Sequence, residues 1–267
     1  MMFRSGIAAV EAAGTRESKG LDVRVADSDL AFEWSRRIWL PISRSPRLFP
    51  LFVRTQRKRR NVPASPAVAI AIDGFPRSAN TFSSRAFVFV NPDVAVSHHM
   101  HAPASILLAV RHGVPAIVVV RSPVDAVLSE VIREPRKRLH RALIEWNSFY
   151  GLVRPVLDRV VVADFSTVTS NYAVVIEEVN RRHGTSFVPY RNSPESDEAV
   201  FASIDAGARL RGKTGSRLET QVPRPSKERA ERKAGLQAEL EQPGLRVLVD
   251  RAQALYSEYL AAAPRSS

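Results

Sequence analysis

The chain has 267 residues, 45% hydrophobic and 25% charged, which suits a globular protein of one or two domains and excludes wholesale disorder or a polytopic membrane protein. It lacks cysteine, which excludes disulfide bonds, a cysteine nucleophile and a cysteine-ligated zinc site. Its 39 Lys and Arg residues outnumber 27 Asp and Glu residues, giving a net charge of +12. Only six of these cations are lysines. Guanidinium groups suit bidentate binding of phosphate or sulfate, although codon bias in a GC-rich genome would also enrich arginine.

Residues 1–65 are expected to form a basic extension and linker ahead of one domain over residues 66–267. Residues 35–60 carry nine Arg or Lys and no acid, with apolar side chains between prolines that exclude one long helix. The segment suits peripheral contact with an anionic membrane, with nucleic acid less favoured, and it could equally lie on the main domain. Neither a signal peptide nor about 18 consecutive apolar residues is evident. We therefore expect a cytoplasmic protein, either free or bound at a membrane surface.

Beyond residue 66, short strand patterns alternate with helix patterns. Strands are predicted over residues 67–72, 94–97, 116–120 and 160–163, and helices over residues 78–89, 124–133, 136–157, 167–183 and 245–260. Continuous Val and Ile runs such as Ala116–Val120 indicate strands that are buried on both faces. The sequence therefore predicts an α/β fold in three layers, with a parallel β-sheet covered by helices on both faces.

In such sheets ligands bind at the carboxyl ends of the strands. The first strand leads into Gly74-Phe75-Pro76-Arg77-Ser78-Ala79-Asn80-Thr81-Phe82. This segment has the spacing of the phosphate-binding P-loop, with Ala79 for its second glycine and Asn80 for its lysine. Backbone N–H groups at the start of the following helix would bind an anion, with Arg77 supplying positive charge. An ordinary strand–helix turn is the alternative.

Three of the six histidines, His98, His99 and His101, follow the second strand. A neutral imidazole there could take a proton from a hydroxyl near pH 7. A zinc site is less favoured, because the neighbouring His98 and His99 are expected to point apart and no fourth ligand is evident. A structural role remains open for each histidine.

Arg121 follows the third strand and precedes a helix that carries Ser129. Together these two side chains would hold one phosphate from two sides. Residues 207–214 fit the full P-loop pattern, but glycine and prolines downstream exclude the helix that it requires, so we interpret them as a basic loop. Residues 160–164 imitate a Walker B strand ending in Asp164, which keeps a nucleotide-dependent kinase open as an alternative.

Together these segments resemble the sulfotransferases that use 3′-phosphoadenosine 5′-phosphosulfate (PAPS). Residues 75–82 align with the family's 5′-phosphosulfate loop, approximately Y-P-K-S-G-T-T-W, and residues 121–129 keep the Arg, Pro, Asp and Ser of its 3′-phosphate motif. His101-Ala102-Pro103 fits the T-H-x-P context of the family's catalytic histidine. Arg211-Gly212-Lys213-Thr214-Gly215 corresponds to the late R-K-G-x-x-G loop, with Leu210 in place of its first basic residue.

The resemblance implies a P-loop fold and sulfuryl transfer from PAPS to a hydroxyl of a carbohydrate, lipid or other small molecule, with no metal required. It implies His101 as the base and Arg77 at the departing sulfuryl group. The 5′ side of the donor would be bound by Pro76, Arg77, Ser78, Ala79, Asn80, Thr81 and Phe82, the last replacing a tryptophan that stacks on adenine. The 3′-phosphate would be bound by Arg121, Ser129, Arg211 and Gly212. A kinase, or a non-catalytic basic protein that binds a membrane surface or nucleic acid, are the alternatives.

Overall fold

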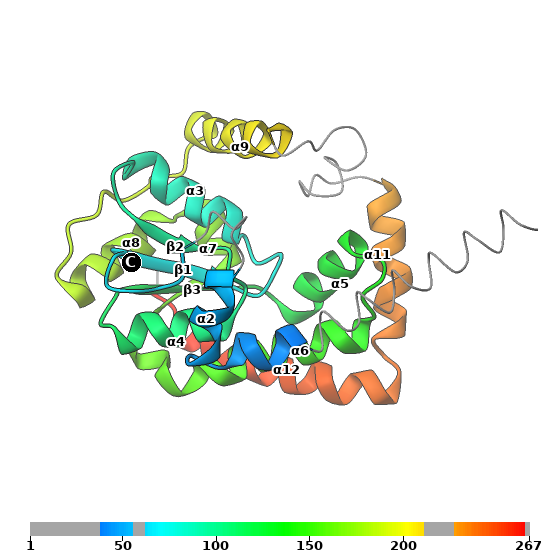
Figure 1. Cartoon of the computed structure of the whole chain (residues 1–267). Coiled ribbons are helices and arrows are strands. Elements are labelled where there is room, and N and C mark those ends of the chain that lie inside the picture. The colour runs from blue at the N-terminus through cyan, green and yellow to red at the C-terminus, as the bar shows by residue number, and fades with distance from the viewer. Residues whose placement is uncertain (1–37, 56–61, 211–226, 265–267) are drawn as a thin grey trace, which may run out of the picture. The chain divides into compact units, whose positions relative to one another are not determined.

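The computed structural model describes residues 38–55, 62–210 and 227–264. The chain divides into two units, Met1–Ile42 and Ser43–Ser267, and every element named below lies in the second unit (Figure 1). Helix α2 (Leu48–Thr55), which precedes residue 66, also belongs to this second unit. Among the helices in the described ranges, none is both long enough and apolar enough to cross a membrane.

A four-stranded parallel sheet forms the centre of the second unit. Its strands are β1 (Ile70–Gly74), β2 (Val96–His98), β3 (Ala116–Val120) and β4 (Val161–Asp164), in the order β2-β1-β3-β4. The predicted α/β fold with a parallel sheet is confirmed, and all four predicted strands exist with ends that differ by up to three residues. The chain leaves β1 toward β2 and leaves β3 toward β4, so the strand order reverses between β1 and β3. Such a reversal opens a crevice at the carboxyl ends of the two central strands.

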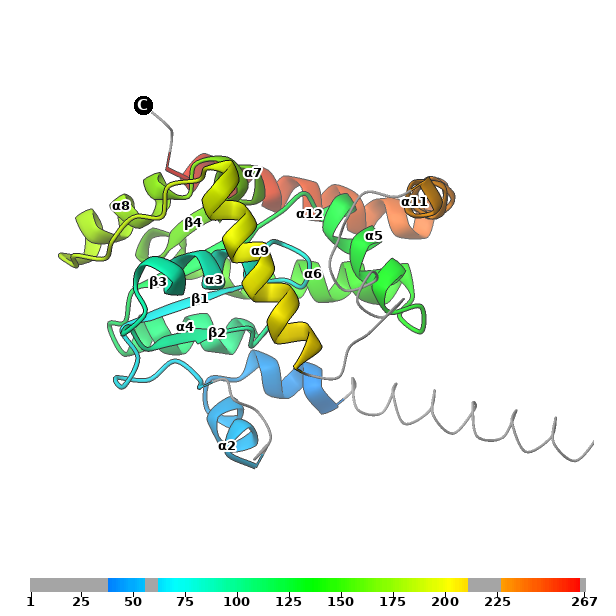
Figure 2. The ribbon, with the colours of Figure 1, turned by 90° about the horizontal axis from the view of Figure 1, so that it is seen from above.

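Helices cover both faces of the sheet, as Figures 1 and 2 show. One face carries α3 (Asn80–Val90), α7 (Phe165–Ser170) and α8 (Ala173–His183), with α9 (Pro194–Arg209) packed on α3. The other face carries α4 (Pro103–Arg111), α6 (Leu139–Val153) and α12 (Pro243–Ala262). Two more helices, α5 (Pro123–Arg133) and α11 (Lys227–Glu239), pack on each other, and α5 also packs on α6 and α12.

Two predicted helices are shorter than their sequence patterns indicate. The helix predicted over residues 136–157 ends at Val153 and is followed by the 3₁₀ helix η1 (Arg154–Arg159). Pro155 lacks an N–H group and Val156 leaves the helical backbone with φ −117°, so the α-helix cannot continue. The helix predicted over residues 167–183 is two helices, because Asn171 adopts φ −154° and ends α7. Helices α2, α4, α9 and α11 were not among the predicted elements.

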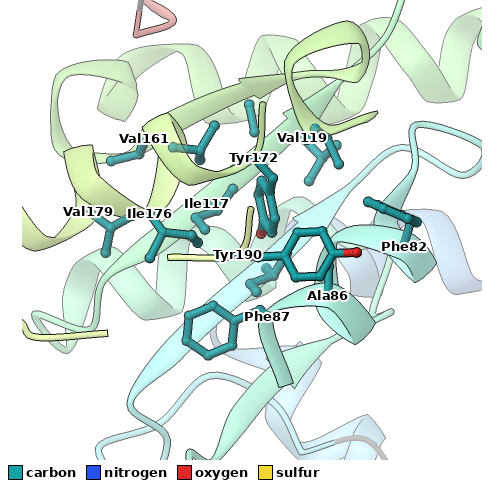
Figure 3. Packing of buried hydrophobic residues seen from close by; sticks show 14 of the residues in the cluster. Phe82, Ala86, Phe87, Ile117, Val119, Val161, Tyr172, Ile176, Val179 and Tyr190 are labelled. Carbon is teal, nitrogen blue, oxygen red and sulfur yellow. The ribbon is translucent and has the colours of Figure 1, made fainter. Parts of the chain in front are cut away.

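The core lies on both sides of the sheet. Toward α3, the strands contribute six fully buried apolar side chains: Ile70, Ile72, Ile117, Val119, Val161 and Ala163. Figure 3 shows this layer packed against aromatic side chains that include Phe87, Tyr172 and Tyr190. On the other face, Tyr150 of α6 packs against Trp146 and Tyr259, with ring centroids 4.4 and 5.1 Å apart. Coverage on both faces explains why β3 has no polar position.

Candidate functional site

The carboxyl ends of the four strands bring the predicted functional loops to one edge of the sheet. Parallel pairing sets Gly74 beside Val119, and Val120 beside Asp164. In the described part of the chain, the non-glycine residues with positive φ all follow β1 or β2 at this edge: Arg77 (70°), Ala79 (70°), His99 (57°) and His101 (49°). A left-handed conformation costs a non-glycine residue roughly 1–2 kcal/mol. Such strain tends to gather at functional sites, so this edge is the candidate site.

The loop between β1 and α3 has a backbone suited to anion binding. Arg77 and Ala79 are left-handed and Ser78 between them is not, an alternation that turns successive N–H groups toward one concave side. Ala79 is the N-cap of α3, and no side chain caps this helix. The first amide groups of α3 are therefore available to a ligand. Ala79 adopts a conformation that glycine usually supplies at this place in a P-loop.

Asn80 turns its side chain back onto the end of β1. Its Nδ2 donates hydrogen bonds to the carbonyl oxygens of Gly74 (3.3 Å) and Phe75 (2.8 Å), and the residue is buried. The group that Asn80 offers to an anion is thus its backbone N–H, since its amide side chain closes the loop from within. A side chain at position 74 would place its Cβ 2.1 Å from the Val119 carbonyl oxygen, so this close approach of β1 to β3 requires glycine.

The buried Tyr150 makes hydrogen bonds to the loop between β1 and α3, and the sequence analysis did not identify it. The Tyr150 hydroxyl donates to the Val119 carbonyl oxygen at 2.8 Å and accepts from the Phe75 N–H at 3.2 Å. It also lies 3.4 Å from the Ser78 hydroxyl. Burial raises the pKa of Tyr150, against hydrogen bonds from Ser78 and Phe75 that lower it, so the phenol stays protonated. Because Tyr150 lies on α6, far from the loop in the sequence, no local sequence pattern predicts this contact.

Two arginines and a serine join the loop after β1 to the loop and helix α5 that follow β3. Arg77 Nε donates to Ser129 Oγ at 3.0 Å, and Arg121 Nη1 donates to the Arg77 carbonyl oxygen at 3.1 Å. The Arg121 guanidinium also lies 4.2 Å from the centroid of the Phe165 ring. The two predicted anion-binding motifs therefore form one cluster. Ser129 contacts Arg77, whereas the sequence pairs Ser129 with Arg121.

Among the three histidines, His101 has the geometry of a proton acceptor. Its Nδ1 lies 3.0 Å from the Gly74 carbonyl oxygen. Because a carbonyl oxygen can only accept, Nδ1 carries a hydrogen, and in the neutral ring Nε2 then carries the lone pair. Nε2 of His101 has no hydrogen-bond partner among the residues that the structure describes.

The expectation that His98 and His99 point apart is wrong. Their Nδ1 atoms are 2.7 Å apart, and Nε2 of His99 lies 2.8 Å from Thr81 Oγ1. The alternation of the strand ends at His99, whose φ of 57° turns its ring back toward His98. Burial, with further contributions from Arg85 and His101, lowers the pKa of His98. The two rings therefore form a hydrogen-bonded chain that ends on the hydroxyl of Thr81, in the first turn of α3.

Asp73 is a second group that sequence reasoning missed. It is buried, and its carboxylate accepts backbone N–H groups from Gly74 (3.0 Å), His101 (3.1 Å) and Ala102 (3.4 Å). One carboxylate oxygen also lies 3.7 Å from Nδ1 of His101. Burial raises the pKa of Asp73 to about 6, although His101 and the backbone hydrogen bonds act to lower it. An acid at the end of an otherwise apolar strand run was the available sequence signal.

Phe82 lies in the core rather than at an open surface. It is buried between the Tyr190 and Phe201 rings, whose centroids lie 6.0 and 5.3 Å from its own. Phe201, on α9, is the exposed member of this group. Tyr190 lies in the same core cluster as Phe82. Phe201 is therefore the solvent-exposed aromatic residue that contacts Phe82, while Phe82 packs α3 against the core.

A buried ion-pair network lies at the junction of α5 and α6. Lys137 is buried, and its Nζ lies 2.8 Å from Glu130 Oε1 and 3.1 Å from Glu145 Oε2. Burial opposes ionisation of Glu130, but Lys137 holds the pKa of that carboxyl below its ordinary value. Since Glu130 follows Ser129 on α5, the network fixes the helix that holds Arg77.

The remaining candidates have structural partners or fall outside the description. The Asp164 carboxylate accepts from the Ser166 backbone N–H (3.0 Å), the Ser166 hydroxyl and the Tyr256 hydroxyl (2.8 Å), and so caps α7. These donors occupy the group that a Walker B interpretation would assign to Mg²⁺. Residues 207–209 form the last turn of α9, and Arg211 and Gly212 lie outside the described residues.

Comparison with known proteins returned a structural match. The chain is similar to a mouse protein whose crystal structure is described as sulfotransferase SULT7A1 complexed with PAP. The match has a TM-score of 0.41 and 11% sequence identity, and it covers 75% of this chain and 91% of the mouse chain. No protein-family model matches the chain, and no curated protein matches it.

Proposed function

We propose that this protein is a PAPS-dependent sulfotransferase that acts on a hydroxyl group. The observation that carries the proposal is the assembly of an anion-binding loop, two arginines and a histidine at one sheet edge. Arg77 is held by Ser129 at 3.0 Å, Arg121 is held on the Arg77 carbonyl oxygen at 3.1 Å, and His101 is held on the Gly74 carbonyl oxygen at 3.0 Å. A donor with phosphates on the 5′ and 3′ oxygens of its ribose needs a cation for each phosphate, and Arg77 and Arg121 would supply them within one cluster.

The donor-binding roles follow from this arrangement. The 5′-phosphosulfate would lie against the N–H groups of residues 77–82, with the Arg77 guanidinium on the bridging oxygen. The 3′-phosphate would lie near Arg121, and Arg211 and Gly212 complete this site in the proposal. For the adenine we favour the exposed ring of Phe201 over Phe82, because stacking needs an accessible aromatic face and Phe82 is buried.

The chemistry is an in-line displacement at sulfur. The bond between sulfur and the 5′-phosphate oxygen breaks while a bond forms between sulfur and the acceptor oxygen. The acceptor proton passes to Nε2 of His101 and later to water, and the 3′,5′-bisphosphate (PAP) leaves. A loose transition state of this kind places charge on the leaving oxygen, where fixed cations and N–H groups stabilise it. The hydrogen bond from Nδ1 to Gly74 keeps the ring oriented for this transfer, and Asp73 stabilises the imidazolium that forms.

Nucleotide binding tests the proposal directly. We expect PAP to raise the melting temperature without a metal, and adenosine 5′-phosphate to bind more weakly because it lacks the 3′-phosphate. Arg121→Ala should weaken PAP binding about 10–100-fold, since a hydrogen-bonded charge contributes roughly 1.5–3 kcal/mol, and should leave adenosine 5′-phosphate nearly unaffected. Arg111→Ala is the matched control, because Arg111 ends α4 and precedes β3, and so lies at the amino ends of the strands, away from the candidate site.

Two outcomes would contradict the assignment. A melting-temperature shift only with ATP and Mg²⁺ would favour the kinase. The side chains of Asn80 and Asp164 argue against a kinase, because both already make hydrogen bonds within the protein. Equal losses for both nucleotides in Arg121→Ala would refute the 3′-phosphate role of that residue. With PAP binding established, ³⁵S-labelled PAPS and a panel of hydroxyl compounds would identify the acceptor.

A further inference from the structure

Helix α2 has two apolar faces, and its own unit covers one of them. Phe49 and Val53, four positions apart, are buried. Leu48 and Leu51, three positions apart, are 51% and 59% exposed. A surface helix normally places polar residues on its outer face. The outer face of α2 therefore carries exposed apolar surface that its packing does not account for.

Positive charge borders these leucines. Arg47 immediately precedes α2 and Arg54 lies in its last turn, and both are exposed. Arg54 lies three positions from Leu51 and thus on the same side of the helix. Residues 35–60 contain nine Arg or Lys and no Asp or Glu, so no acid of this segment offsets the charge. Apolar side chains among arginines are complementary to the boundary between lipid phosphates and acyl chains.

Helix α2 lies at the margin of the second unit. Figure 2 shows α2 on the β2 side of this unit. β2 is the edge strand of the sheet. A planar surface could approach α2 from outside without displacing a strand.

We propose that the outer face of α2 docks on an anionic membrane, with Leu48 and Leu51 entering the headgroup boundary and Arg47 and Arg54 contacting lipid phosphates. The leucines favour a membrane over nucleic acid, because a phosphate backbone offers aliphatic side chains no apolar partner. Arginine is suited to the boundary, since its stem can lie along apolar surface while its guanidinium stays in the polar layer. The docking face is independent of the proposed sulfuryl transfer.

Vesicle co-sedimentation of the full chain tests this surface. We expect the wild type to bind vesicles that contain phosphatidylserine and to bind pure phosphatidylcholine vesicles far less. A Leu48→Ser/Leu51→Ser variant should lose at least about tenfold in partition coefficient, because two partly exposed leucines no longer enter the bilayer. Arg47→Ser/Arg54→Ser should also bind at least about tenfold less to the anionic vesicles, and added salt should reduce wild-type binding.

The control variant is Val247→Ser, which removes an apolar side chain that is 71% exposed on α12. It should bind vesicles as the wild type does. Because all the altered side chains are exposed, melting temperatures and PAP binding should stay unchanged, which separates this test from that of the proposed function. Unchanged vesicle binding in the leucine variant would overturn the proposal. So would binding to short duplex DNA with no affinity for either vesicle, which would identify a nucleic-acid surface instead.

Discussion

Replacing Asp73 with asparagine removes a buried charge and nearly preserves the shape of the side chain. Oδ1 accepts the N–H groups of Gly74 and His101, and the asparagine oxygen can keep both. The N–H of Ala102, which now meets Oδ2 at 3.4 Å, would lose its acceptor. The variant therefore isolates the ionisation of Asp73 at the cost of one long hydrogen bond.

The expected pH dependence follows from the direction of the shift. Burial raises the pKa of Asp73 from 3.8 to about 6 in the folded chain. Between these values the folded protein binds more protons than the unfolded chain, so the free energy of unfolding falls as pH rises through this window. A shift of about two pKa units, at about 1.4 kcal/mol each, amounts to about 3 kcal/mol. Wild type should lose about that much between pH 4 and pH 7 relative to Asp73→Asn, which has no such group.

Urea denaturation at half-unit pH intervals measures the difference between the two proteins. Groups with opposite shifts, such as Glu178, whose pKa its hydrogen bond from Arg181 lowers to about 2, are present in both proteins and cancel. Repeating the pair in a His101→Ala background should steepen the slope, because His101 lowers the pKa of Asp73. If the difference in unfolding free energy between the two proteins does not change from pH 4 to pH 7, the raised pKa of Asp73 is refuted. The proposed stabilisation of the His101 imidazolium by Asp73 would then lose its support.

Three further changes address the site. Tyr150→Phe should cost about 1–3 kcal/mol of stability, because it leaves the buried Phe75 N–H unpaired, and should weaken PAP binding measured by calorimetry. In the control Tyr259→Phe, the lost hydroxyl donates to the Tyr150 carbonyl oxygen at 2.8 Å, so this variant should lose about 1 kcal/mol of stability and bind PAP as the wild type does. Equal losses of PAP affinity in both variants would contradict the role of Tyr150 in the loop. Lys137→Met should destabilise by roughly 3–5 kcal/mol at pH 7 in urea titrations, because it leaves the buried Glu130 carboxylate without its partner, whereas Glu145 keeps its ion pair with Arg141. A loss under 1 kcal/mol would show that the Glu130 carboxylate is solvated. His101→Ala should lower the sulfotransfer rate about 10²–10⁴-fold with PAP affinity retained, and a larger effect of His99→Ala would assign the base to His99.

The sequence predicted those parts of the fold that depend on local pattern. The Val and Ile runs identified all four strands, and the residues after them identified the sheet edge where Arg77, Arg121 and His101 lie. What it missed depends on contacts between distant segments. Tyr150 reaches the Phe75 N–H across 75 positions, and nothing in the periodicity of α6 marks a tyrosine for that contact. The error on His98 and His99 has a different cause, because alternation along a strand predicts opposite directions only while the backbone stays extended, and His99 is left-handed.

In the proposed function, the loop between β1 and α3 binds an anion without the lysine of the P-loop pattern. Asn80 stands at the lysine position, and its side-chain amide donates hydrogen bonds to the carbonyl oxygens of Gly74 and Phe75. A positive charge for the anion must therefore come from a residue outside α3. Arg77 supplies it from a left-handed position within the loop, and the Ser129 hydroxyl on α5 accepts the hydrogen bond from its Nε. Arg121 in turn holds the Arg77 carbonyl oxygen. The charge is thus positioned before any ligand arrives, and an electrostatic site that is already oriented stabilises developing negative charge without reorganisation during the reaction. A single lysine on a flexible stem would place its charge with less constraint. Because the Arg77 guanidinium is instead held in one position, we expect the loop between β1 and α3 to favour a donor whose phosphates have a fixed spacing.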